Sequence, residues 1–318
     1  MLTLAELEAA HALVREALQP SPALRWPLLC ERLGGEVVVK HENHNPTGAF
    51  KVRGGLTYVD ALLRRAPQTR AFVSATRGNH GQSLAFAAAR AGVRPIIFVP
   101  HGNSQEKNAA MRALGAELAE HGHDFQAARE EAQRYAQAHG LEMVPSFHRD
   151  LVRGVATYAL ELLHAHPDLA TLYVPIGLGS GICGAIAARD ALNLKTEIVG
   201  VQAAGAPAYA LSFAAGRPVM TNSADTLADG VATRAADAQA LEIILKGAAR
   251  IVVVSDDEIA EAVRAYWTDT HNLAEGAGAA PLAAACQEKP AGKTGLVLTG
   301  GNIDFALFQS WIVQGTNT

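Results

Sequence analysis

The sequence has few cysteines, and their distribution limits what the protein can be. Cys30, Cys183 and Cys286 are odd in number and widely spaced, which argues against a disulfide framework and against a cysteine-based zinc site. Each is expected to serve as a small apolar core residue. The scarcity of cysteine fits a reducing compartment, so we expect a cytoplasmic protein.

Long apolar runs and basic clusters are also missing. The apolar segments are far too short to span a bilayer, and residues 1–18 have the pattern of an amphipathic helix instead of a secretory signal. The 27 Lys and Arg residues against 31 Asp and Glu residues give a formal net charge of -4. The cations are scattered and are not interleaved with aromatics. These absences predict neither a membrane partner nor a nucleic-acid partner.

The residues that are present indicate a packed α/β fold. Hydrophobic residues make up 49% of the chain and charged residues 18%, and 318 residues suffice for two ordinary domains or one large one. Short apolar segments alternate with helices rich in Ala, Leu, Glu and Arg, which predicts mostly parallel sheets covered by helices. The predicted strands are 36–42, 71–76, 94–100, 141–147, 171–177, 197–203, 250–256 and 294–300, and helices between them include Asn79–Ala91, Ser104–Leu114, Phe125–Ala138 and Asp256–Thr268.

Ligands of such folds bind beyond the carboxyl ends of the strands, where loops meet helix N-termini. The first loop of this kind places Lys51 after a Pro–Thr–Gly turn, at the expected start of a helix. A helix N-terminus disfavours a cation and so helps to hold an amine neutral, as a nucleophilic or Schiff-base lysine requires. A solvated surface lysine remains an open alternative on this segment alone.

The second loop, residues 74–83, is rich in glycine and polar side chains. Its backbone N–H groups and the Asn79 amide suit an anionic or phenolic ligand. Asn79 is also a good helix-capping residue, so a capped turn is the alternative interpretation. His80, taken alone, is more often structural than catalytic.

The third loop, residues 177–184, is rich in glycine and directly precedes a helix. Glycines let the backbone wrap a phosphate, whose charge the helix N-terminus favours. The dinucleotide pattern G-x-G-x-x-G fits from Gly179 to Gly184, but the following strand ends in no carboxylate, and the Lys-Ser/Thr pair of a P-loop is absent. In the fourth loop, the Thr299 hydroxyl can contact a heteroatom or simply close a turn.

Taken together, in this order and spacing, the four loops resemble those of the fold-type II pyridoxal-phosphate enzymes, and of the threonine/serine dehydratase (ammonia-lyase) branch in particular. The resemblance extends through 104–116, 226–230 and 275–279, so it covers nearly the whole chain. It implies two lobes of mostly parallel sheet with the cofactor in the cleft between them. The implied large cofactor-binding domain comprises residues 1–48 and 147–318, and the small domain comprises residues 49–146.

The resemblance also implies roles for individual residues. Lys51 matches the lysine that carries pyridoxal 5'-phosphate and takes the Cα proton of the substrate. Phe50 matches the residue packed against the cofactor ring, Asn79 the amide that bonds its 3-hydroxyl, and Thr299 the hydroxyl that faces its pyridine nitrogen. The implied phosphate cradle is Gly177, Leu178, Gly179, Ser180 and Gly181, and the implied substrate contacts are Ser74, Thr76, Arg77, Gly78 and His80.

The implied reaction removes water and ammonia from a β-hydroxy amino acid and yields a 2-oxo acid. A neutral hydroxyl at Thr299 leaves the pyridine nitrogen largely unprotonated, which suits prompt loss of a β-substituent better than transamination. The expected partners are an amino-acid substrate and a second copy of the chain in a homodimer. A non-catalytic ligand-binding or sensor protein on the same fold is the alternative from another class.

Arg77 departs from the family pattern. Serine racemases have at this position a serine that acts as a base, and an arginine is always protonated and cannot abstract a proton. Racemisation is therefore disfavoured, whereas a guanidinium can bind a second substrate carboxylate, as in 3-hydroxyaspartate. The alternative is that Arg77 points away into a salt bridge. Asp225 and Asp229 lie near a region where some relatives hold a divalent cation, but we interpret them as solvated loop acids and predict no metal site.

Overall fold

The structure is a computed structural model that describes residues 2–314, and these residues form two sheets. The larger sheet has the strand order β1-β2-β10-β7-β8-β9, and the smaller has the order β5-β4-β3-β6. Neighbouring strands in the described residues run parallel, except that β1 is antiparallel to β2. The strands are β1 (Ala23–Arg25), β2 (Val37–His41), β3 (Ala71–Ala75), β4 (Arg94–Val99), β5 (Glu117–Glu120), β6 (Glu142–Met143), β7 (Thr171–Pro175), β8 (Glu197–Ala203), β9 (Arg250–Val254) and β10 (Thr294–Leu298).

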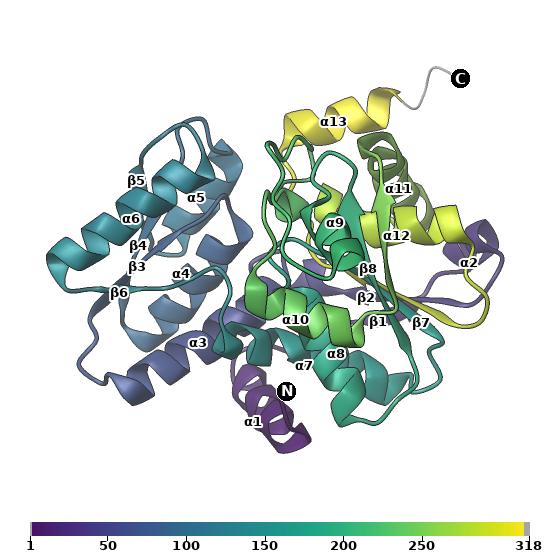
Figure 1. The fold of residues 1–318 in the computed structure, drawn as a ribbon, viewed down its shortest axis with the longest axis horizontal. Coiled ribbons are helices and arrows are strands. Elements are labelled where there is room, and N and C mark those ends of the chain that lie inside the picture. Colours follow the sequence, from purple (N-terminus) through teal and green to yellow (C-terminus); the bar gives the residue numbers. More distant parts are fainter. Residues whose placement is uncertain (1, 315–318) are drawn as a thin grey trace.

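Helices cover both sheets, and the small sheet with its helices forms the lobe on the left of Figure 1. The α-helices are α1 (Leu4–Arg15), α2 (Pro27–Leu33), α3 (Lys51–Arg65), α4 (Asn79–Ala91), α5 (Gln105–Ala113), α6 (Phe125–His139), α7 (Arg149–Ala165), α8 (Ser180–Ala191), α9 (Ala208–Ala215), α10 (Ala238–Gly247), α11 (Asp256–Thr270), α12 (Gly276–Glu288) and α13 (Phe305–Gln314). Two short 3-10 helices, η1 (Glu42–His44) and η2 (Asp229–Val231), lie in loops.

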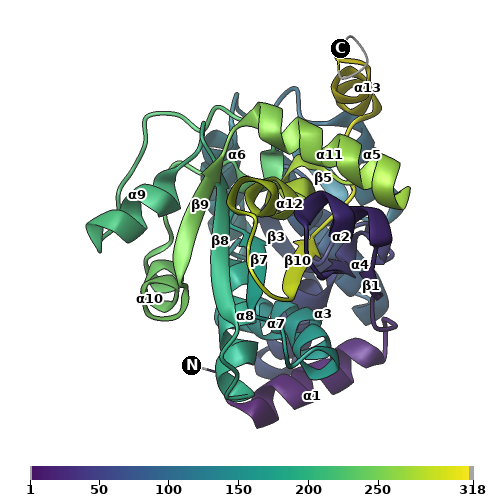
Figure 2. The ribbon, with the colours of Figure 1, turned by 90° about the vertical axis from the view of Figure 1, so that its right-hand side faces the viewer.

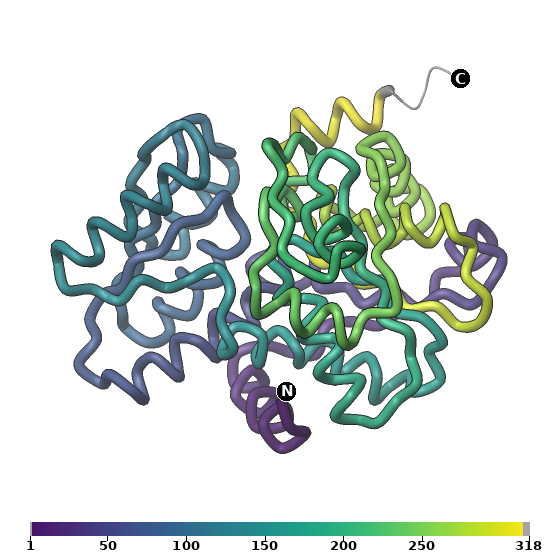
Figure 3. Tube along the Cα trace, viewed as in Figure 1, coloured from purple at the N-terminus to yellow at the C-terminus, as the bar shows by residue number. Residues whose placement is uncertain are grey.

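The chain leaves the large sheet after β2, builds the small sheet, and returns to the large sheet at β7 (Figure 3). The last strand, β10, pairs in parallel with β2 and places Leu298 beside His41. Figure 2 shows β10 next to β7 in the same layer. The loops that follow β2, β7 and β10 therefore leave the large sheet at one edge, although they are far apart in the sequence.

Alternate residues of the central strands face opposite layers of helices. In β3, Phe72 packs with side chains of α3 and α4, whereas Val73 packs against α6. In β7, Tyr173 lies in the cluster formed with α11 and α12, and Val174 lies in the cluster formed with α7 and α8. Each fully buried aliphatic side chain contributes roughly 1.5–3 kcal/mol. This packing holds the strand ends in place, and with them the loops that carry the candidate site residues.

The predicted α/β class with mostly parallel sheets is confirmed. Each predicted strand is present, although the segment 141–147 contains only the two residues of β6. The sequence does not predict β1 and β5, because both are short, partly exposed edge strands without an apolar run. The predicted domain division stays a prediction, and the strands of the small sheet fall within residues 49–146. None of the helices described is long and apolar enough to cross a membrane.

Candidate active site

The four loops chosen from the sequence meet between the two sheets. The backbone N–H of Phe50 donates a 2.9 Å hydrogen bond to the carbonyl of Thr299, which joins the first loop to the fourth. The Phe50 ring also lies against Gly181 of the third loop, since a Cβ built there would be 3.6 Å from the ring. Asn79 of the second loop reaches Glu275, whose own N–H bonds to Gly300. The predicted convergence of the loops is therefore observed.

Lys51 is the first residue of α3, as predicted. Its Nζ lies 4.8 Å from the centroid of the Phe50 ring, and its side chain is partly buried. Burial lowers the pKa of Lys51 to about 8, and the nearby carboxyl of Glu275 opposes this shift. The sequence led us to expect a neutral amine because of the helix N-terminus, whereas in the structure the lowered pKa comes chiefly from loss of solvent. The alternative of a solvated surface lysine is wrong.

Asn79 is the first residue of α4, and its side chain does not cap that helix. Its Nδ2 donates to Oε1 of Glu275 at 2.7 Å, and its Oδ1 accepts from Nδ2 of Asn302 at 2.8 Å. The alternative interpretation of Asn79 as a simple helix cap is therefore wrong. The amide is held between two polar side chains of the large sheet's loops instead.

The glycine-rich loop ends at the N-terminus of α8, where Gly179 has a left-handed φ of 97°. A side chain at Gly177 would collide with the carbonyl of Gly230, and the carbonyls of Leu178 and Gly181 accept hydrogen bonds from tyrosine hydroxyls. Within residues 2–314 no side chain caps this helix. Its first N–H groups are therefore open to an anion such as a phosphate.

The other predicted residues of the second and fourth loops lie close by. Ser74 donates its hydroxyl to the carbonyl of Val144 and so faces into the small sheet, and the Thr76 hydroxyl accepts from the N–H of Gly78. Burial, together with the charge of Lys51, lowers the pKa of His80 to about 3, so its ring is neutral. Its Nε2 has no hydrogen-bond partner among the described residues. Thr299 is buried, and the contact of its hydroxyl with a cofactor stays a prediction.

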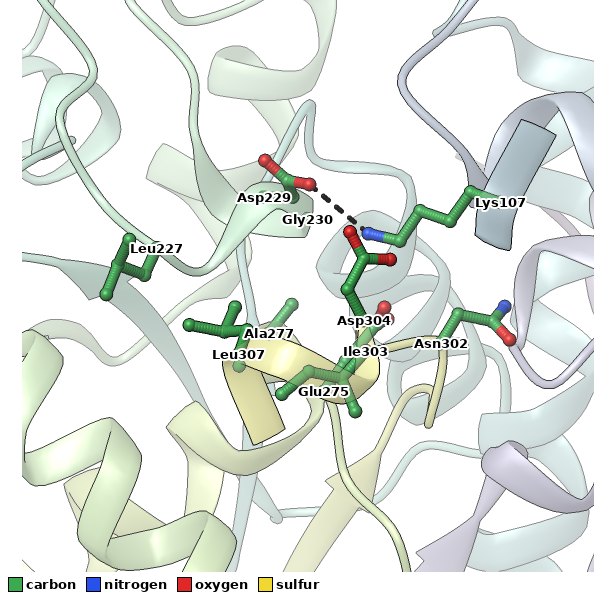
Figure 4. A pocket seen from close by; sticks show the side chains of 11 residues that line it. Lys107, Leu227, Asp229, Gly230, Glu275, Ala277, Asn302, Ile303, Asp304 and Leu307 are labelled. Atoms are coloured by element: carbon green, nitrogen blue, oxygen red, sulfur yellow. Dashed lines mark hydrogen bonds and ion pairs between the residues drawn. The ribbon is translucent and has the colours of Figure 1, made fainter. Parts of the chain in front are cut away.

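Arg77 forms a salt bridge across the gap between the two sheets. Its guanidinium lies 3.1 Å from Oδ1 of Asp229 in η2, and Nζ of Lys107 in α5 lies 3.2 Å from Oδ2 of the same carboxylate (Figure 4). The interpretation of Asp229 as a solvated loop acid is therefore wrong, because two cations of the small lobe pair with it. The Arg77 side chain remains 49% exposed, so the guanidinium is still accessible to an anion.

Comparisons with known proteins agree with this geometry. Residues 14–300 match the family described as "Pyridoxal-phosphate dependent enzyme". The chain belongs to this family. A protein of Geobacter sulfurreducens named L-threonine ammonia-lyase is 35% identical, over 99% of this chain and 79% of the relative. A Saccharomyces cerevisiae protein named L-threo-3-hydroxyaspartate ammonia-lyase is 28% identical, over 94% of this chain and 93% of the relative.

Solved structures show the same fold. The crystal structure of a threonine deaminase, its source abbreviated as T.th., has a TM-score of 0.90 at 29% identity and covers 96% of this chain and 99% of its own. A pyridoxal 5'-phosphate-dependent aspartate racemase has a TM-score of 0.91 at 28% identity, over 96% of this chain and 97% of its own. The predicted resemblance to fold-type II pyridoxal-phosphate enzymes is confirmed.

The residues at the site of this pyridoxal-phosphate-dependent enzyme fit its cofactor. Pyridoxal 5'-phosphate presents an aldehyde, a phenolic oxygen and a phosphate, and the loops offer a complement to each. Lys51 supplies an amine whose pKa is lowered, Asn79 an amide donor, and the N-terminus of α8 a row of N–H groups. The glycines of the third loop keep side chains out of the place that the phosphate needs.

Sequence reasoning missed several polar residues of the site. A cavity of about 30 Å³ lies beside Lys107 and Asp229, and Figure 4 shows their side chains converging with those of other loops. Glu275, Asn302 and Asp304 also line it. The available signal was position: Glu275 directly precedes a Gly-Ala-Gly-Ala helix start, and Asn302 follows the end of β10. In the described part of the chain no group of three or more His, Cys, Asp or Glu side chains is arranged to hold a metal ion.

Proposed function

We propose that the protein uses pyridoxal 5'-phosphate to eliminate water from a β-hydroxy amino acid of the threonine or serine type, releasing a 2-oxo acid and ammonia. Relatives named L-threonine ammonia-lyase and the threonine deaminase structure support this reaction. The observation that carries the proposal is Lys51, a partly buried amine at the start of α3 with its pKa lowered to about 8. A sensor protein needs no such amine beside a phosphate-binding helix.

When bound, the cofactor supplies an electron sink that stabilises negative charge at the substrate Cα. Lys51 holds and moves the proton. At pH 7.5 an amine with a pKa of about 8 is roughly one quarter neutral, whereas an ordinary lysine is neutral in about one molecule in a thousand. Nζ of Lys51 is thus able to accept the Cα proton near neutral pH.

The other site residues orient the reacting groups. The N–H groups at the start of α8 bind the phosphate, and the Asn79 amide donates to the phenolic oxygen. The neutral ring of His80, with its unpartnered Nε2, closes the site beside Lys51 without adding a charge. Holding these groups in fixed positions brings the Lys51 amine and the substrate Cα together, which removes the entropic cost of an encounter.

Two measurements on the purified protein test the proposal. Pyridoxal 5'-phosphate should produce a visible absorption band that borohydride fixes, and peptide mapping should find the label on Lys51. A panel of L-threonine, L-serine and 3-hydroxyaspartate is then assayed for ammonia and 2-oxo acid. Labelling of Lys51 without release of either product from any of these amino acids would refute the lyase and favour a sensor.

A second candidate is a 3-hydroxyaspartate ammonia-lyase, and the half-exposed guanidinium of Arg77 favours it. A relative of that name exists in Saccharomyces cerevisiae. Asp229 already pairs with this guanidinium at 3.1 Å. A second substrate carboxylate must therefore compete with a built-in one, which makes the threonine or serine reaction the better supported of the two.

We also propose a homodimer in the cytoplasm, with no nucleic-acid partner. The three cysteines are free thiols, as a reducing compartment requires, and the net charge of -4 opposes binding to nucleic acid. Sedimentation equilibrium should give twice the chain mass. A monomer at micromolar concentration would contradict the dimer.

A further inference from the structure

Glu275 occupies an unusual place for a carboxylate. It is the N-cap residue of α12, yet its side chain makes no capping hydrogen bond to that helix, and the residue is only 6% exposed. Its backbone N–H donates to the carbonyl of Gly300, and a Cβ built at Gly300 would lie 2.5 Å from Oε1 of Glu275. The glycine at the end of β10 thus makes room for a buried carboxylate that turns away from its own helix.

The buried carboxylate is the end of a chain of hydrogen bonds with a single direction. At the other end, the carbonyl of Thr47 can only accept, so Nδ2 of Asn302 faces it at 2.8 Å. The same Nδ2 donates to Oδ1 of Asn79 at 2.8 Å, which turns the amide nitrogen of Asn79 toward Glu275 at 2.7 Å. A carboxylate and a backbone carbonyl as the two terminal acceptors allow only this orientation of both amides.

This orientation determines what Asn79 offers to a ligand. One N–H of its amide is used by Glu275 and its oxygen is used by Asn302, which leaves one N–H donor. A flipped amide would present oxygen to the phenolic oxygen of the cofactor and repel it. Hydrogen bonds to an ionised acceptor are roughly twice as strong as neutral ones, so Glu275 also polarises the remaining N–H.

We propose that Glu275 and Asn302 are positioning residues that hold the Asn79 amide with its free N–H toward the cofactor's phenolic oxygen, an inference that rests on the Asn79 role proposed above. The surroundings support a carboxylate there. Burial raises the pKa of Glu275, whereas Lys107, the hydrogen bond from Asn79 and Lys51 lower it. The two lysines thus offset part of the cost of an ionised group in this place.

The experiment compares two cofactors on cofactor-free protein. Glu275→Gln removes the charge and adds a competing donor, and Asn302→Ala frees the Asn79 oxygen. Both variants should bind pyridoxal 5'-phosphate about tenfold more weakly than the parent in an absorbance titration. Both should bind 3-deoxypyridoxal 5'-phosphate, which lacks the phenolic oxygen, within about twofold of the parent, because the lost contact does not exist for that analogue.

A matched control separates positioning from general stability. Glu288→Gln removes a carboxylate at the far end of α12, where it pairs with Arg250 at 2.8 Å. It should lower the melting temperature and leave the affinity for both ligands unchanged. Equal losses for the two ligands in Glu275→Gln and Asn302→Ala, or no loss for either, would overturn the inference. A parent that binds the cofactor and releases no 2-oxo acid would overturn the proposed function and leave this comparison standing.

Discussion

Two clusters of charged side chains lie on opposite sides of the Lys51 segment, and they differ in how their charges are matched. In the first, here called the closed cluster, Arg53 pairs with Glu42 at 2.7 Å and with Glu161 at 2.8 Å, and Lys40 pairs with Glu161 at 2.6 Å. These side chains are at most 8% exposed. In the second, the open cluster, Arg77 and Lys107 share the carboxylate of Asp229.

The difference separates a structural task from a binding task. The closed cluster holds two cations and two carboxylates, and the neutral side chains of Ser21, Asn45 and Thr157 fill further hydrogen bonds to them. It joins α3 to β2, η1 and α7, and it places Lys51 two residues from a fixed point. The open cluster has two cations for one carboxylate, and Arg77 and Asp229 are partly exposed. Its surplus positive charge suits an anionic ligand.

The largest expected effect is the loss of activity in Lys51→Ala. Without the amine, the cofactor has no covalent attachment and the Cα proton has no acceptor, so turnover should fall by at least about a thousandfold. Circular dichroism should show a fold like that of the parent, because the closed cluster does not involve Lys51. Borohydride labelling of another lysine with normal turnover would show that Lys51 does not carry the cofactor.

Breaking the closed cluster should mainly affect stability. Arg53→Met leaves Glu42 and Glu161 buried with fewer partners, which should cost about 3–5 kcal/mol in the free energy of unfolding, measured by urea denaturation. The control is Arg64→Met on the same helix, where the arginine side chain is 77% exposed and pairs with Asp60. That change should cost less than about 1 kcal/mol. Similar losses in the two variants would remove the distinction between closed and exposed ion pairs.

The parts of the molecule that depend on local pattern were predictable from the sequence. β3 and β7 are buried on both faces and read as unbroken apolar runs, which the parallel sheets explain. Lys51 was placed at a helix start because a Pro–Thr–Gly turn precedes it. Parallel strands open their loops at one edge, so the convergence of the four loops also followed.

The rest depended on contacts between distant segments. Asn79 meets Glu275 and Asn302 only because β3 and β10 belong to sheets that face each other. The pairing of Asp229 with Arg77 and Lys107 has the same origin, and a sequence pattern carries no sign of it. The cause of the lowered pKa of Lys51 was misjudged for a related reason, since burial depends on the assembled structure.

The stability of the cofactor-free protein should depend on pH through Lys51. Its pKa is lowered from 10.5 to about 8, so between these values the unfolded chain keeps a proton that the folded protein has lost, and stability rises with pH. Below pH 8 the folded protein bears the cost of a buried cation. Lys51→Met should therefore be more stable than the parent at pH 7, on the order of 2 kcal/mol for this partly buried group.

This advantage of Lys51→Met should shrink as the pH rises toward 10.5, because the parent then has a neutral amine as well. Lys246→Met is the control, since its lysine is exposed and pairs with Glu242 on the surface of α10. Thermal denaturation at several pH values measures the difference. A gain from Lys51→Met that is the same at pH 7 and pH 10 would show that packing, and not charge, is responsible.

The smallest effect is expected at the open cluster, in Arg77→Ala. If a substrate β-carboxylate uses the surplus charge, the variant should lose about threefold to tenfold in kcat/KM for 3-hydroxyaspartate and little for L-threonine and L-serine. The loss is modest because the guanidinium is half exposed and Asp229 already pairs with it. Asp229→Asn should have the opposite effect on 3-hydroxyaspartate, since it removes the competing carboxylate, whereas Arg70→Ala, on the surface of the small lobe, should change nothing. Equal losses on all three substrates would assign Arg77 to the contact between the lobes and leave threonine or serine as the substrate.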